Sequence, residues 1–132
     1  MNIYKSDYIE ISFDSQKSII TNEWFSVTSQ MTDEIYKKEM LKFVEFVKIH
    51  KPKFHLIKSL NFLYVITIEM QNWTNENVFP VLAQNGIKKI SFLVSSEIIA
   101  QMSIEQALEE NNASVFEIKY FDSEKSAIDW LS

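Results

Sequence analysis

The sequence predicts a single α/β domain in which about four helices pack on a five-stranded mixed sheet. Short β-rich segments alternate with segments whose apolar residues recur every three or four positions. The chain has 132 residues, 46% of them hydrophobic, which is enough to bury one core. It contains one Gly, two Pro and no low-complexity tract, so we expect one domain over residues 1–132.

The first two strands are predicted to form an antiparallel hairpin. Residues 8–13 alternate between apolar and polar side chains, which is typical of a half-buried strand. A turn-like break at residues 14–17 separates them from a second β-rich run at residues 19–27. Two such runs with a short polar connection favour direct antiparallel pairing.

The following segment is the clearest helix. Thr32 is placed to cap it, and Asp33 and Glu34 follow in the first turn, where the helix dipole favours negative charge. Pro52 ends it. Five apolar positions share one face, which we expect to cover the sheet: Tyr36, Met40, Phe43, Val44 and Val47.

A short apolar run at residues 54–60 is typical of a strand covered on both faces. Residues 67–85 follow a helical pattern, but Pro80 removes a backbone donor, so we expect a kink or two abutting helical pieces. Gly86 stands where a left-handed cap is needed after the helix.

The last part of the chain continues the alternation. It predicts strands at residues 90–95 and 116–121, a helix from Ser103 to Glu110 that opens with a capping box, and a closing helix at residues 123–131. Strands joined through helices by right-handed crossovers run parallel. The predicted sheet is therefore an antiparallel hairpin followed by parallel strands.

Composition excludes several classes of function. The net charge is −5 and all 13 basic residues are Lys, which disfavours nucleic acid as a partner. Cysteine is absent, so no disulfide, zinc–thiolate site or cysteine nucleophile is expected. No apolar run reaches the ~20 residues needed to cross a bilayer. The first ten residues lack a signal-peptide pattern, so we expect a cytoplasmic protein.

Two segments, residues 77–110 and 117–132, together with Trp73, resemble the small stand-alone SpoIIAA-like proteins of the STAS group, which is distantly similar to SEC14 domains. The likeness rests on the order and spacing of a few motifs. These are Phe79-Pro80, Gly86 before a Lys-Lys-led strand, Gln101-Met102-Ser103, Tyr120-Phe121-Asp122 and Ala127-Ile128-Asp129-Trp130-Leu131.

The resemblance implies an α/β sandwich. In the anti-anti-sigma branch it would also imply a phosphorylation site after the strand that here ends at residues 58–61. This sequence departs from that pattern, because Lys58 stands where relatives often carry Asp and no Gly follows Ser59. A SEC14-like role would require a lipid cavity.

Polar residues at two strand ends are candidates for binding, since ligands of α/β proteins bind at the carboxyl ends of parallel strands. After the third strand these are Lys58 and Asn61, and after the fourth strand they are Ser95 and Ser96. Each has a plainer interpretation: Lys58 as a lysine that extends to water, and the two serines as a helix cap.

No catalytic set is recognisable. An enzymatic hypothesis would place Lys58, Glu69 and Ser95 around one cleft, but no matched acid, base or nucleophile accompanies them. The two histidines, His50 and His55, flank Pro52 and have no third ligand near them, so we predict neither a metal site nor a cofactor.

The apolar segment at residues 62–66 is the remaining candidate, either as core or as an interface. The leading hypothesis is a non-enzymatic domain that acts by protein–protein contact, including self-association as a homodimer, through Phe62, Tyr64 and Trp73, with Lys58 and Asn61 on the rim. The alternative is a carrier of a small apolar or amphipathic ligand held between this segment and the helix that contains Trp73.

Overall fold

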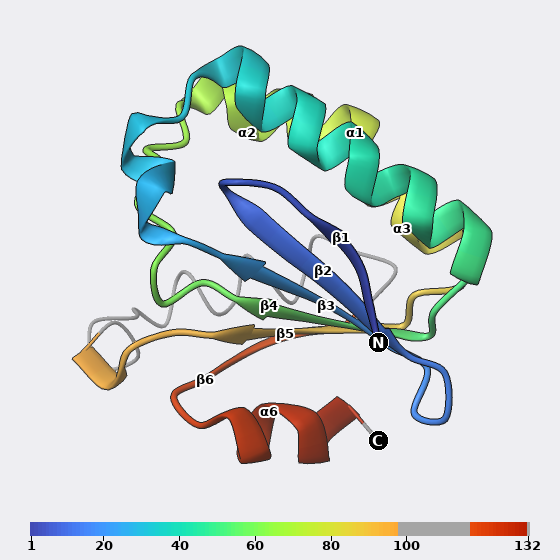
Figure 1. The fold of residues 1–132 in the computed structure, drawn as a ribbon. Helices are drawn as coiled ribbons and strands as arrows, with labels where there is room; N and C mark the ends of the chain where they lie inside the picture. Colours follow the sequence, from blue (N-terminus) through green and yellow to red (C-terminus); the bar gives the residue numbers. More distant parts are fainter. Residues whose placement is uncertain (98–116, 132) are drawn as a thin grey trace.

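The computed structural model describes residues 1–97 and 117–131. Six strands form one sheet in the order β1-β2-β3-β4-β5-β6 (Figure 1). The first three strands pair antiparallel and the remaining neighbours pair parallel. The strands are β1 (Asn2–Lys5), β2 (Ile9–Asp14), β3 (Ile19–Trp24), β4 (Phe54–Lys58), β5 (Lys89–Leu93) and β6 (Glu117–Phe121).

The α/β class and the mixed sheet are confirmed, but the number of strands was wrong: the sheet has six strands, not five. The missed strand is β1, an edge strand of four residues that pairs only with β2. Its signal in the sequence is weak: the strand has four residues, of which the two end residues are exposed, so the alternation of apolar and polar side chains is too short to predict a strand.

Helices cover both faces of the sheet (Figure 1). On one face lie α1 (Asp33–His50), α2 (Ile68–Asn77) and α3 (Phe79–Gln84), and on the other lies α6 (Glu124–Leu131). A short 3-10 helix, η1 (Ser26–Gln30), precedes α1. Within the described ranges, no helix combines the length and apolar character needed to cross a membrane. The predicted helix from Ser103 to Glu110 lies outside the described residues.

Local sequence signals explain where the helices begin and end. The Thr32 hydroxyl accepts a hydrogen bond from the Ile35 amide at 3.2 Å, as expected of an N-cap. Two abutting pieces, α2 and α3, confirm the expected break near Pro80, which takes one of the first positions of α3 where no amide donor is needed. Gly86 adopts a φ of 103°, which an L side chain rarely tolerates.

The main core lies between the sheet and α1, α2 and α3. Strand alternation directs one set of side chains to this face, including Ile9 and Ile11 of β2, Ile20 of β3 and Ile90 of β5, all fully buried. A smaller cluster on the opposite face packs around α6. It comprises Ile19, Leu56, Ala127 and Leu131, with partly buried Phe54, Phe121, Ile128 and Trp130.

Candidate functional site

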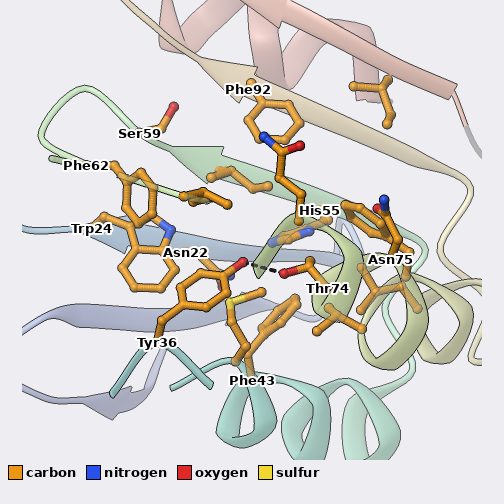
Figure 2. Close-up of a pocket in the computed structure, with 18 of the residues that line it drawn as sticks. Asn22, Trp24, Tyr36, Phe43, His55, Ser59, Phe62, Thr74, Asn75 and Phe92 are labelled. Atoms are coloured by element: carbon orange, nitrogen blue, oxygen red, sulfur yellow. Dashed lines mark hydrogen bonds between the residues drawn. The ribbon is translucent and has the colours of Figure 1, made fainter. Parts of the chain in front are cut away.

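A cavity of about 440 Å³ lies within the main core, between the sheet and helices α1, α2 and α3 (Figure 2). Pockets that bind small molecules are typically about 300–1,000 Å³, so its size fits a small ligand. The sheet supplies the floor and the helices supply the roof. The floor consists of Asn22, Trp24, His55, Ile57, Phe92, Ile118 and Tyr120. The roof consists of Tyr36, Met40, Phe43, Gln71, Thr74, Asn75, Val78, Phe79 and Leu82, and Ser59, Phe62 and Ile66 come from the loop after β4.

Two polar residues interrupt the apolar floor. Asn22 and His55 are 1% and 2% exposed, and they occupy inward-facing positions on the neighbouring strands β3 and β4. Within the described part of the chain, neither the Oδ1 atom of Asn22 nor either ring nitrogen of His55 has a hydrogen-bond partner. A buried polar atom without a partner costs about 1–3 kcal/mol, so these two residues of the cavity floor are candidates for contact with a ligand.

Burial determines the charge state of His55. One face of its imidazole lies against the ring of Phe43, with the ring centroids 4.6 Å apart. Desolvation lowers the pKa of His55 from 6.5 to about 3, because the charged form cannot be hydrated there. At neutral pH the imidazole is therefore uncharged and offers one donor and one acceptor.

The roof carries a satisfied polar pair. The Thr74 hydroxyl donates to the Met70 carbonyl oxygen at 2.8 Å, so the Tyr36 hydroxyl, 2.7 Å away, donates its own hydrogen to Thr74 Oγ1 (Figure 2). Burial raises the pKa of Tyr36. This hydrogen bond links α1 to α2 above the cavity.

Two lining residues of α2 reach solvent. Gln71 and Asn75 both line the cavity and are exposed to solvent, unlike the buried Thr74 on the same helix. They are one turn apart, so they occupy the same side of α2.

The loop at residues 59–67 closes one end of the cavity and is anchored by hydrogen bonds. The Leu63 amide donates to Thr28 Oγ1 at 2.8 Å, and the Ser59 hydroxyl donates to the Leu93 carbonyl at 3.0 Å. Because the backbone is extended, side chains alternate in direction. Phe62, Tyr64 and Ile66 point inward, whereas Leu63 and Val65 are exposed.

Residues 62–66 therefore contribute to both the core and the surface. Phe62 lines the cavity and makes an edge-on contact with Trp24, with centroids 4.8 Å apart. Tyr64 is buried, stacks on Tyr36 at 5.0 Å and donates a hydrogen bond to Asp33. Burial, reinforced by that hydrogen bond, raises the pKa of Tyr64. Tyr64 is thus a support for the roof.

The other sequence-predicted site residues do not line the cavity. Trp73 packs edge-on against Tyr36 at 6.1 Å, behind the roof. Lys58 Nζ pairs with Glu124 Oε1 at 3.1 Å and so faces α6 across the sheet. Asn61 is exposed. Ser95 and Ser96 follow β5 outside the cavity lining, Ser95 half-buried and Ser96 exposed.

The structure does not bring the enzymatic set together at the cavity. Lys58, Glu69 and Ser95 are all absent from its lining. Among the described residues there is also no group of three or more His, Asp or Glu side chains arranged to hold a metal ion.

Sequence reasoning missed Asn22 and considered His55 only as a metal ligand. A usable signal was present: in Ile20-x-Asn22-x-Trp24 and in His55-x-Ile57, a polar residue occupies the apolar side of an alternating strand. No protein-family model matches the chain, and neither a curated protein nor a solved structure matches it significantly.

Proposed function

We propose that this chain is a non-enzymatic binding module that holds a small, mainly apolar molecule in the cavity between the sheet and α1, α2 and α3. The observation that carries the proposal is a cavity of about 440 Å³ whose apolar lining includes two buried polar side chains, Asn22 and His55, with atoms that have no hydrogen-bond partner among the described residues. Folding alone gives no reason to retain such groups, since an apolar residue would fill either position at lower cost.

A binding role is favoured over a catalytic one by the chemistry of the lining. The described lining residues include no carboxylate and no lysine, and His55 has no acidic partner that could orient it as a base. Aromatic and aliphatic side chains dominate, which suits the burial of an apolar ligand.

The assignment to the SpoIIAA-like class of the STAS group is part of this proposal. Its support is the sequence pattern around Phe79-Pro80, Gly86 and residues 117–132, with which a mixed sheet is compatible. An interior ligand would relate the chain to the ligand-binding side of that group by analogy of fold.

The test is titration with N-phenyl-1-naphthylamine, an uncharged fluorophore whose emission increases in apolar surroundings. The fluorophore itself is excited, so that tryptophan variants can be compared. The full chain is expected to bind it with saturation. Asn75→Trp, at an exposed position of the cavity lining, should fill part of the cavity and weaken binding at least tenfold. Native mass spectrometry of gently purified protein should also show a retained small molecule.

Asn72→Trp is the matched control, since Asn72 is exposed on the same helix but does not line the cavity. It should bind the fluorophore as the unchanged chain does. A chain that shows no saturable binding, or binding that is equal in both tryptophan variants, would refute the proposal.

A second candidate function is self-association through the outer side of the same loop. Four large side chains there, Leu60, Leu63, Val65 and Ile68, are each more than half exposed. Residues 59–68 carry no charged side chain, so two copies could meet across a two-fold axis without repulsion.

Size-exclusion chromatography with light scattering tests this candidate. A dimer that becomes a monomer with Val65→Asp, but not with Ile49→Asp on the exposed side of α1, would support it. A strict monomer at all concentrations would end it.

A further inference from the structure

The two unpartnered polar residues specify more than the presence of a ligand. Asn22 lies opposite Ile57 on β4, and His55 lies two positions before Ile57 on the same strand. Standard strand spacing places their Cα atoms about 8 Å apart on one face of the sheet. Both side chains belong to the cavity floor, with their polar atoms buried, and they are close enough to each other for one small polar group to bridge them.

The chemistry of these atoms restricts that group. Asn22 Oδ1 needs a hydrogen-bond donor, whereas a neutral imidazole needs both an acceptor and a donor. No charged side chain is present among the described lining residues. A carboxylate or ammonium group placed there would lose its hydration without gaining an opposite charge, so a charged group is disfavoured at this position.

We infer that the buried end of the ligand is an uncharged group that both donates and accepts hydrogen bonds, of the primary carboxamide type, held by Asn22 and His55 while the apolar remainder fills the cavity. This inference rests on the binding function proposed above. The low pKa of His55 is consistent with it, because the imidazole stays neutral over the physiological range.

The Ser91 hydroxyl supplies an internal control. It is also fully buried and without a partner, but the alternation of β5 directs it to the face covered by α6, next to Leu56. Removal of this hydroxyl changes the number of unsatisfied buried groups without touching the cavity. Any effect on ligand preference that is shared by Ser91→Ala would therefore be indirect.

The experiment is displacement of N-phenyl-1-naphthylamine by three ligands that share one ring system: naphthalene, which has no polar group, and the isosteric pair 2-naphthamide and 2-naphthoate. We expect 2-naphthamide to bind at least tenfold more tightly than either 2-naphthoate or naphthalene. In Asn22→Leu and, separately, His55→Leu, the preference for 2-naphthamide over naphthalene should fall at least tenfold. In Ser91→Ala it should be unchanged.

The outcomes separate the two claims. If the fluorophore does not bind the unchanged chain, the proposed function fails. If it binds but the three ligands compete equally, or if neither leucine variant alters the preference, the cavity is a general apolar site and the carboxamide inference alone is overturned. Circular dichroism and fluorophore binding of each variant show whether it is folded. Because Asn22 and His55 are replaced in separate variants, the test still holds if one of the two variants does not fold.

Discussion

The imidazole of His55 lies nearly parallel to the ring of Phe43, with centroids 4.6 Å apart and planes inclined by 25°. This contact packs a titratable group of the central strand β4 against the main helix, α1, in the middle of the core. It removes one face of the imidazole from solvent, and the sheet removes most of the rest. The ring consequently behaves as an aromatic core residue that carries two unused polar atoms.

The first prediction concerns stability as a function of pH. The pKa of His55 is lowered to about 3 in the folded chain and is 6.5 when exposed, so below pH 6.5 the unfolded state binds more protons. The stabilisation is complete above that pH and is lost as the pH falls toward 3. We expect the free energy of unfolding to decrease by about 1.4 kcal/mol per pH unit from this residue, measured by urea denaturation between pH 7 and pH 5.

His55→Leu separates this effect from the titration of carboxylates. The variant should lose this contribution to the pH dependence between pH 6.5 and pH 5. An unchanged slope in the variant would show that His55 is hydrated in solution.

A second prediction concerns the buried carboxylate of α1. Glu39 is 3% exposed, and it accepts hydrogen bonds from the Tyr4 hydroxyl at 2.6 Å and from the Ser6 hydroxyl. It thereby ties the edge strand β1 and the following turn to α1. We expect Tyr4→Phe to lower the free energy of unfolding by about 1.5–3 kcal/mol, because a bond to a charged acceptor is lost.

Glu45→Leu is the control for Glu39→Leu on the same helix, since Glu45 is exposed and forms only an i, i+3 pair with Lys42. Glu45→Leu should change the free energy of unfolding by about 0.5 kcal/mol or less. Glu39→Leu should lower it by several times more, because the Tyr4 and Ser6 hydroxyls lose their acceptor. Equal costs in urea denaturation would contradict this role for Glu39.

A third prediction separates the two sides of the loop after β4. Tyr64→Asp should lower the free energy of unfolding by more than about 3 kcal/mol, because it places a buried charge near Asp33 and removes the ring that stacks on Tyr36. Val65→Asp, at a position that is 81% exposed, should leave stability within about 0.5 kcal/mol. Thermal unfolding of both variants checks the expectation, and a stable Tyr64→Asp would show that the loop is not anchored as described.

The fourth prediction concerns Lys58. Its ammonium group pairs with the half-exposed Glu124 on the α6 side of the sheet, away from the cavity. A partly exposed pair contributes little, so Lys58→Ala should cost about 1 kcal/mol or less. The affinity for N-phenyl-1-naphthylamine should stay within twofold of that of the unchanged chain. A larger loss of affinity would show that Lys58 contributes to binding.

Local sequence signals predicted the elements better than the site. The hairpin, α1 with its Thr32 cap, and the interruption near Pro80 could all be derived from near neighbours in the chain, and the structure confirms them. The candidate residues Lys58, Asn61, Ser95 and Ser96 were selected because they follow parallel strands. That rule gives the end of the sheet but not the face, and the cavity lies on the opposite face from Lys58.

The sequence by itself determined an α/β domain with an N-terminal hairpin and later parallel strands, because periodicity, caps and turn residues act over a few positions. Only the tertiary structure decided that Asn22 and His55 share one apolar wall, and that Tyr36 and Thr74, 38 positions apart, hold its roof. The physical reason is that a cavity is the volume left between elements after they pack. Whether a polar atom in its lining has a hydrogen-bond partner therefore depends on residues that are distant in the sequence.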